Sequence, residues 1–156
     1  MTLNSRALDL VILLHYKADN TPYNLRLDDW RRRKMNAAEH LGTYAEGWTK
    51  GDADTIIKAT AEDYTFDDPN SGVVSRNAFS SYLGDLKETV ASLCGGRVPD
   101  PFMELSEVLT QEAEGVLTAW CWWTIPGTEM KGSGLIKVDA TGVRSEVITY
   151  YTKLSG

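Results

Sequence analysis

The segment Ala61–Pro69 carries the residues best suited to proton transfer. It reads AEDYTFDDP, and a strand through its middle places alternate side chains on one face, so Phe66 and Asp68 point together while Asp67 points away. If Phe66 lies in the core, Asp68 enters the same cavity. A carboxylate there loses hydration, which raises its pKa toward the range in which a general base works at neutral pH.

A tyrosine on a predicted helix supplies the second group that such chemistry needs. Apolar residues recur at spacings of three and four through residues 36–49, which indicates an amphipathic helix with Tyr44 on its buried stripe. From there Tyr44 could donate a hydrogen bond to a substrate oxygen that becomes negative as Asp68 removes a proton. Both residues also have a structural interpretation: an Asp before Pro69 often caps its own turn, and Tyr44 fits a core position.

Three helices and a short hairpin are predicted around these two residues. A cluster of turn-forming residues at 67–72 reverses the chain, so 64–66 and 73–74 form the arms of the hairpin. Capping residues and glycines bound the helices. The helices are 36–49 before Gly51, 52–60 with Asp52 as N-cap, and one from Phe79 to Leu93 between an N-cap at Ser75 and Gly95-Gly96.

The second half of the chain changes from helical to strand periodicity. Four runs with alternating polarity are separated by short turns, which favours an antiparallel meander. Helices followed by such a sheet are typical of the α+β class, and three helices across one face of a curved sheet would enclose a cone-shaped pocket. The predicted strands are 102–110, 116–125, 130–138 and 143–152.

Composition and charge exclude several classes of protein. The 156 residues fit one domain of about 100–200 residues, and a hydrophobic content of 42% is that of a globular protein. A net charge of -6 opposes nucleic-acid binding. The two histidines form no pair at metal-ligand spacing and no Gly-rich phosphate loop is present, so we expect neither a metal nor a cofactor.

The apolar stretch 7–15 could be taken for a leader, but its length and charges argue against one. Asp9 and His15 interrupt it, no Ala-x-Ala cleavage site follows, and it falls short of the roughly 20 apolar residues that span a bilayer. Cys94 and Cys121 belong to no Cys-x-x-Cys motif and are expected to be separate buried thiols. We therefore expect a cytoplasmic protein without membrane contact.

The motifs and the order of elements resemble the nuclear transport factor 2-like superfamily, closest to its ketosteroid isomerases and SnoaL-like polyketide cyclases. The resemblance rests on Tyr44, on Gly51-Asp52 with Asp52 eight residues later, and on the run that ends at Asp68-Pro69; it covers about residues 36–153. It implies a cystatin-like cone in residues 35–156, with 1–34 as an N-terminal extension. In ketosteroid isomerases, the residue at the position of Tyr44 supplies the oxyanion hole and that of Asp68 shuttles the proton.

Two departures separate the chain from particular branches of this superfamily. The second, protonated Asp of the ketosteroid isomerases would fall near Ser133 or Gly134, where this chain has no acid. Limonene epoxide hydrolases need an Asp-Arg-Asp set, and the spacing of Lys131, Arg144 and Glu146 does not recreate it. Epoxide opening is therefore a less favoured activity.

An aromatic run on the second predicted strand indicates how the sheet is used. Matching the Pro126-Gly127 turn to that of the superfamily puts Cys121 and Trp123 inward and Trp120 and Trp122 outward. Outward tryptophans would form an apolar patch, which predicts a homodimer through the outer sheet face. The same alternation on the last strand sends Val147, Thr149 and Tyr151 inward.

These observations give a leading hypothesis and two alternatives. The leading hypothesis is an enzyme that moves a proton on a small, largely apolar carbonyl or hydroxyl substrate, as an isomerase, dehydratase or cyclase, with Asp68 as base and Tyr44 as oxyanion donor. The alternatives are a non-catalytic module that binds a small ligand and an adaptor that holds a protein partner. The predicted pocket walls are Trp48, Phe66, Phe79, Tyr82, Trp123, Thr149 and Tyr151.

Overall fold

The computed structural model describes residues 35–151 of the chain. The predicted extension 1–34 and the apolar stretch 7–15 lie outside the described residues. No helix in the described range is long and apolar enough to cross a membrane. The elements are α3 (Ala37–Lys50), α4 (Ala53–Lys58), β1 (Thr60–Asp68), β2 (Gly72–Ser75), the 3-10 turn η1 (Arg76–Ala78), α5 (Phe79–Leu93), β3 (Glu104–Ala113), β4 (Val116–Thr124), β5 (Lys131–Asp139) and β6 (Gly142–Tyr150).

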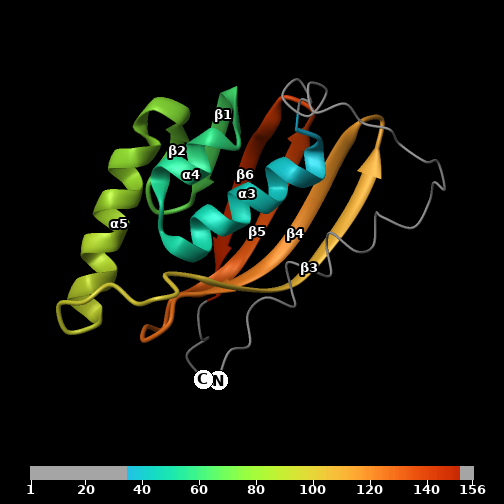
Figure 1. The fold of residues 1–156 in the computed structure, drawn as a ribbon. Coiled ribbons are helices and arrows are strands. Elements are labelled where there is room, and N and C mark those ends of the chain that lie inside the picture. Colours follow the sequence, from blue (N-terminus) through green and yellow to red (C-terminus); the bar gives the residue numbers. More distant parts are fainter. Residues whose placement is uncertain (1–34, 152–156) are drawn as a thin grey trace, which may run out of the picture. The chain divides into compact units, whose positions relative to one another are not determined.

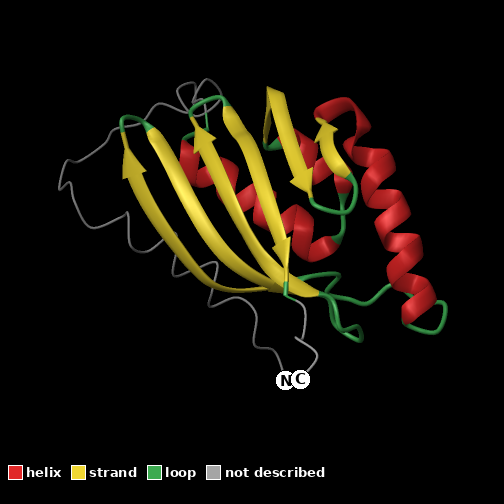
Figure 2. Ribbon diagram, turned by 180° about the vertical axis from the view of Figure 1, so that it is seen from behind, coloured by secondary structure: helices red, strands yellow, loops and turns green. Residues whose placement is uncertain are grey.

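The strands form one curved, open sheet in the order β2-β1-β6-β5-β4-β3. Neighbouring strands are antiparallel except β1 and β6, which run parallel. The described helices all lie on one face of this sheet (Figure 1), and Figure 2 shows the opposite face without a described helix. The α+β class and the meander of the last four strands are thus confirmed; the parallel pairing that joins the hairpin to the meander was not predicted.

Caps define the helices much as the sequence indicates. Asn36 and Glu39 form a reciprocal capping box at the start of α3, and Gly51 ends that helix in the left-handed conformation at φ 63°. Asp52 caps α4 as predicted, accepting from the backbone N–H of Asp54. The predicted cap at Ser75 is wrong: its side chain makes no capping hydrogen bond, and the turn η1 separates it from α5.

Aromatic rings fill the space between the helices and the inner face of the sheet. Tyr44 and Trp48 of α3 contact Tyr64 and Phe66 of β1, and Phe79 of α5 joins the cluster, with ring centroids 5.5–6.4 Å apart. Most of these pairs meet edge to face, the arrangement that adds about 0.5–1.5 kcal/mol per pair beyond burial. The centre of the cone, where the sequence predicts a pocket, is therefore occupied by side chains.

A bulge in β6 reverses the inward and outward positions predicted for that strand. Ser145 pairs with Lys137 and Val143 with Val138, so Arg144 has no counterpart on β5. From this point Glu146, Ile148 and Tyr150 point inward. The predicted inward set of Val147, Thr149 and Tyr151 lies on the outer face instead. The predicted orientation of the tryptophans is confirmed: Cys121 and Trp123 are buried, whereas Trp120 and Trp122 face outward.

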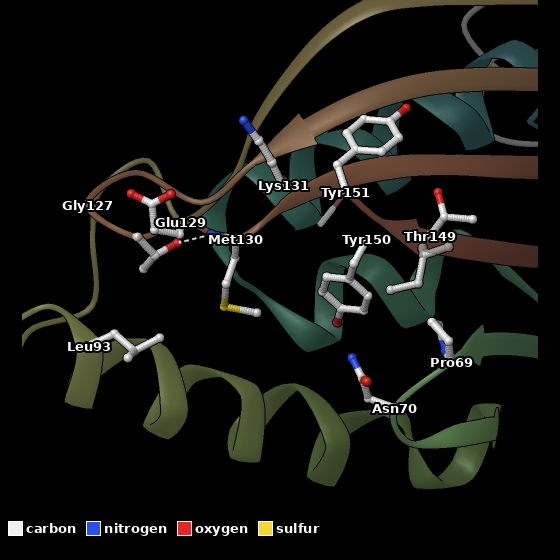
Figure 3. A pocket seen from close by; sticks show the side chains of 12 residues that line it. Pro69, Asn70, Leu93, Gly127, Glu129, Met130, Lys131, Thr149, Tyr150 and Tyr151 are labelled. Carbon is white, nitrogen blue, oxygen red and sulfur yellow. Dashed lines mark hydrogen bonds between the residues drawn. The ribbon is translucent and has the colours of Figure 1, made fainter. Parts of the chain in front are cut away.

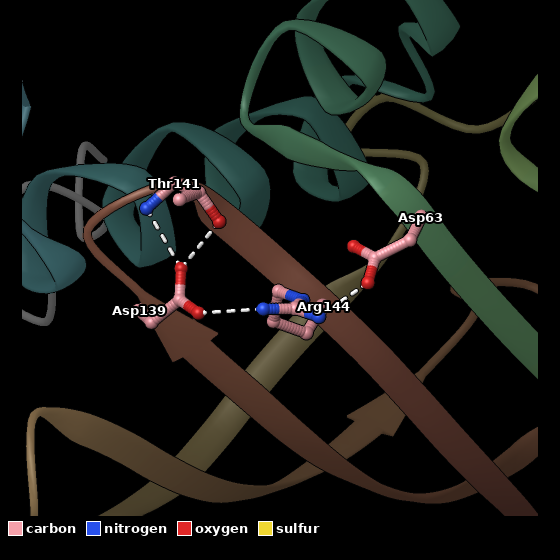
Figure 4. Close-up of polar contacts among 4 residues, drawn as sticks. All are labelled: Asp63, Asp139, Thr141 and Arg144. Carbon is pink, nitrogen blue, oxygen red and sulfur yellow. Dashed lines mark hydrogen bonds and ion pairs between the residues drawn. The ribbon is translucent and has the colours of Figure 1, made fainter.

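Polar contacts hold the bulged residue in place (Figure 4). The guanidinium of Arg144 donates to Asp63 of β1 and, over 2.9 Å, to Asp139 at the end of β5. Asp139 also accepts from the backbone N–H of Thr141 at 2.7 Å, which fixes the β5–β6 turn. These contacts tie β1, β5 and β6 together at the end of the sheet where β6 begins.

The left-handed turn at Gly51 gives a stability prediction. In Gly51→Ala, the backbone of the alanine must keep the positive φ, and its Cβ would lie 2.9 Å from the ring of Phe102. We therefore expect a loss of about 2 kcal/mol in the free energy of unfolding. Gly84→Ala is the matched control, because Gly84 is an exposed position within α5 with nothing within 4 Å of the added carbon. It should stabilise by about 0.5–1 kcal/mol. Urea denaturation followed by circular dichroism measures the free energy of unfolding of both variants. Equal changes in the two variants would contradict this prediction.

Candidate functional site

The structure gives Asp68 and Tyr44 different partners. The carboxylate of Asp68 bonds to the hydroxyls of Tyr82 and Tyr150, whereas the hydroxyl of Tyr44 bonds to Tyr64 and Glu146. The two residues that the sequence pairs therefore belong to two separate polar groups. We call them the Asp68 group and the Glu146 network.

Asp68 is the last residue of β1 and is only 2% exposed. Its Oδ2 accepts from the hydroxyl of Tyr82 at 2.7 Å and lies 3.3 Å from that of Tyr150 and 3.4 Å from that of Ser71. Its Oδ1 accepts from the backbone N–H of Asn70 at 2.8 Å. The contact with the backbone N–H of Asn70 is the turn cap that an Asp before Pro69 often forms. Among the described residues, no Lys or Arg forms an ion pair with this carboxylate, so hydroxyl and amide donors compensate its burial.

Tyr82 and Tyr150 reach the same oxygen of Asp68 from two different elements. Tyr82 lies on the inward stripe of α5, and Tyr150 ends β6, which runs beside β1. Burial and the hydrogen bond with Asp68 raise the pKa of Tyr82 well above its usual value, and burial and the charge of Asp68 raise the pKa of Tyr150. Both phenols therefore keep their protons at neutral pH and act as donors to the carboxylate.

A cleft of about 860 Å³ opens beside this group (Figure 3). In the figure, the phenol of Tyr150 and the amide of Asn70 point toward one another, with Met130 beside them, whereas Lys131 and Tyr151 project to the other side of the strands. Asp68 lies directly behind this wall, because it bonds to both Tyr150 and the backbone of Asn70. The lining residues are Pro69, Asn70, Leu93, Gly127, Thr128, Glu129, Met130, Lys131, Ile148, Thr149, Tyr150 and Tyr151.

The predicted wall residues are divided between the core and this cleft. Thr149 and Tyr151 border the cleft, but the bulge in β6 turns their side chains to the outer face. Tyr82 contacts Asp68, and the ring of Trp123 packs edge to face on Tyr150 with centroids 5.3 Å apart. The other three predicted wall residues belong to the aromatic core. They are Trp48, Phe66 and Phe79.

Sequence reasoning missed Tyr150 and Asn70, which form the polar end of the cleft. Tyr150 was hidden by the bulge, since unbroken alternation from Val143 sends Tyr151 inward in its place. Asn70 could have been found, because it follows Asp68 by two residues within a turn-forming cluster.

The Glu146 network is a sealed chain of three side chains. Tyr44 donates to Glu146 Oε2 at 2.5 Å, and its hydroxyl lies 2.6 Å from that of Tyr64. Burial raises the pKa of Glu146 to about 7, although the hydrogen bond from Tyr44 acts in the opposite direction. The nearby indole N–H of Trp48 also lowers the pKa of Glu146, although it forms no hydrogen bond of normal geometry.

The carboxyl of Glu146 lies beside Gly134, near which the resemblance to ketosteroid isomerases implies a second acid. A Cβ added to Gly134 would lie 2.3 Å from Glu146 Oε1, so the carboxyl fills the space left by the missing side chain. Gly134 of β5 pairs with Ile148 of β6, which puts the acid on the neighbouring strand rather than on the third strand of the meander. The sequence names Glu146 only with Lys131 and Arg144, whose spacing does not recreate an Asp-Arg-Asp set, so its place beside Gly134 was not predicted.

Comparisons with known structures agree on the architecture, whereas the sequence matches no family model and no curated protein. An NTF2-like protein of unknown function from Cytophaga hutchinsonii superposes with a TM-score of 0.52 at 12% identity, covering 77% of this chain and 94% of that one. A candidate polyketide cyclase from Xanthomonas campestris gives 0.52 at 16% identity, over 76% and 92%. An uncharacterized cystatin-fold protein from Novosphingobium aromaticivorans gives 0.50 at 11% identity, over 74% and 98%.

The chain has a nuclear transport factor 2-like fold. This confirms the fold that the resemblance implies, including the cystatin-like arrangement of helices on a curved sheet. Identities of 11–16% carry the fold and nothing finer, so the chemistry has to be argued from the side chains of this chain.

The buried acid of this NTF2-like fold gives a pH prediction. Glu146 keeps its proton up to about pH 7 in the folded state, whereas the unfolded chain releases it near pH 4.5. The stabilising effect of protonation is complete below pH 4.5 and is lost as the pH rises through 7, a change of roughly 3 kcal/mol. Glu146→Gln, which cannot ionise, should therefore gain stability relative to the native chain between these values.

Urea midpoints measured from pH 4.5 to 8 test this expectation. Glu62→Gln is the control, since Glu62 is an exposed glutamate on β1. Parallel stability profiles for the native chain and Glu146→Gln would show that Glu146 is not the titrating group.

Proposed function

We propose that this protein is a small-molecule enzyme in which Asp68 acts as the general base. The supporting observation is a 2% exposed carboxylate, held by hydroxyl and amide donors alone among the described residues, directly behind the wall of a largely apolar cleft. Such a carboxylate has a fixed orientation, and a bound substrate would bring a C–H or O–H proton to it in place of water. Isomerisation, dehydration and aldol-type cyclisation all begin with this step.

The cleft suits a substrate with one polar end and an apolar body. Asn70 and Tyr150 supply the polar end beside Asp68, while Leu93, Met130 and Ile148 supply apolar surface. A carbonyl or hydroxyl at the polar end would place the hydrogen of the adjacent atom near Asp68. The resemblance to ketosteroid isomerases and SnoaL-like cyclases supports this class of substrate.

A specific observation favours a second function, that of a non-catalytic module binding a small ligand. Tyr44, the donor expected from the resemblance, is fully buried and already has two hydrogen-bond partners. Without that donor the cleft could hold a ligand whose hydroxyl simply bonds to Asp68. The two functions differ in whether a proton is moved.

Asp68→Asn separates these two functions. The amide keeps the size of the side chain but cannot take up a proton, so we expect turnover to fall at least 100-fold while ligand affinity changes little. A panel of small enolisable carbonyl compounds, screened by thermal stabilisation and then for turnover, supplies the ligand. Asp67→Asn, one residue earlier and on the opposite face of β1, is the matched control. Full activity in Asp68→Asn would refute the general-base function.

The outer face of the sheet is proposed as the interface of a homodimer. Trp120 and Trp122 stack there with ring centroids 5.7 Å apart, and Trp120, Leu135 and Val147 are cross-strand neighbours in one row. Each residue of that row is 40–47% exposed, so the row forms a continuous apolar strip in the described chain. An adaptor function would use the same strip to hold a different protein.

A charge placed in this strip tests the dimer. Trp120→Glu should convert a dimer to a monomer in analytical ultracentrifugation, because a dimer would bury the new carboxylate without a partner. Val73→Glu is the control, since Val73 is exposed on β2, three strands away from β5. A native chain that sediments as a monomer at high micromolar concentration would remove the proposal.

A further inference from the structure

Tyr150 occupies the only position where a hydroxyl both contacts Asp68 and lines the cleft, among the described residues. It ends β6, is half-buried, and its hydroxyl is 3.3 Å from Asp68 Oδ2. The same oxygen already accepts from Tyr82 at 2.7 Å. Two phenols thus share one carboxylate oxygen, and only one of the two reaches the cleft.

The two phenols hold Asp68 with different strength. A hydroxyl–oxygen bond normally measures about 2.5–3.0 Å, so the contact from Tyr82 is a full hydrogen bond and the contact from Tyr150 is a weak one. A ligand oxygen could therefore replace Asp68 as the acceptor of Tyr150 at little cost. Tyr82 would meanwhile keep the carboxylate in position.

The geometry points to Tyr150, rather than Tyr44, as the hydroxyl that acts together with Asp68, and we infer that it donates to the oxygen of an enolisable carbonyl substrate as Asp68 removes the adjacent proton. This inference rests on the proposed function and names its second catalytic residue and its substrate class. Tyr44 does not fit this role, because its hydroxyl is sealed between Tyr64 and Glu146.

The reaction step follows from the positions of the two groups. A carbonyl oxygen and a hydrogen on the neighbouring carbon lie close together on one edge of the substrate, as do Tyr150 and Asp68 at 3.3 Å. The C–H bond breaks, the proton goes to Asp68 Oδ2, and the electron pair moves through the carbonyl to make an enolate. The enolate oxygen accepts the hydrogen bond from Tyr150. Where the broken C–H bond lies between the carbonyl and a C=C bond, the proton on Asp68 returns to the far carbon of that C=C bond, the double bond shifts into conjugation, and the substrate is isomerised.

The side chains around Tyr150 hold its ring in place, as a hydrogen-bond donor to a developing negative charge requires. Trp123 packs edge to face on its ring. The indole of Trp123 in turn packs closely over Gly132, where an added Cβ would lie 2.5 Å from it. A donor fixed before the charge develops stabilises the transition state without reorganisation. Because burial and Asp68 raise the pKa of the phenol, it keeps its proton while it donates.

The first test measures binding and uses 2-naphthol, whose hydroxyl imitates an enolate oxygen, against naphthalene, which lacks it. Tyr150→Phe should weaken binding of 2-naphthol about tenfold and leave binding of naphthalene unchanged. A variant that merely disturbs the cleft would weaken both. Failure of the native chain to prefer 2-naphthol, or equal losses for both probes in Tyr150→Phe, would overturn the inference.

The second test measures kcat and KM with a carbonyl compound that the native chain turns over. Tyr150→Phe should lower kcat about 100-fold with little change in KM, whereas Tyr44→Phe should keep most of the turnover of its folded fraction. Loss of turnover in Asp68→Asn and Tyr44→Phe but not in Tyr150→Phe would assign the donor to Tyr44 and overturn the inference alone. Full turnover in Asp68→Asn would instead refute the proposed function.

Discussion

The aromatic cluster between the helices and the sheet is the contact on which the rest of the structure depends. It joins α3, β1 and α5 through rings that touch edge to face, and these rings occupy the space between the three elements. Polar groups are consequently found in two places, sealed behind the cluster around Glu146 or at its edge around Asp68. Both carboxyl groups are almost fully buried, and their partners separate them: Asn70 and Tyr150 beside Asp68 line the cleft, whereas Tyr44 beside Glu146 does not.

The sequence predicted the elements well because their signals are local. The caps at Asp52 and Gly51, the turn after Asp68 and the alternation of β4 each depend on a few adjacent residues, and the structure confirms them. The orientation of β6 depends on Arg144, a single extra residue opposite β5, and no local pattern marks it. One bulge therefore moved Glu146 and Tyr150 inward and Thr149 and Tyr151 outward.

The candidate site shows the same division between local and long-range signals. Asp68 was predicted from strand alternation within nine residues, and its burial agrees with that prediction. Its phenolic partners lie 14 and 82 residues away in sequence, so only the packing of α5 and the pairing of β1 with β6 identify them. Tyr44 was correctly placed in the buried interior, but its partner is an acid from β6.

The structural and catalytic interpretations of Asp68 are compatible, because they use different oxygens. Oδ1 caps the turn through the backbone of Asn70, while Oδ2 accepts from Tyr82 and from Tyr150, the second of which lines the cleft. A general base must be held rigidly and must also have an oxygen that a substrate can approach. In the proposed function, a substrate approaches Oδ2 by displacing the weak contact from Tyr150. The carboxyl of Glu146 is enclosed by Tyr44 and by the backbone near Gly134, and neither residue lines the cleft. Burial is thus common to both acids, and the proposed function falls to Asp68 because two of its partners, Asn70 and Tyr150, line open space.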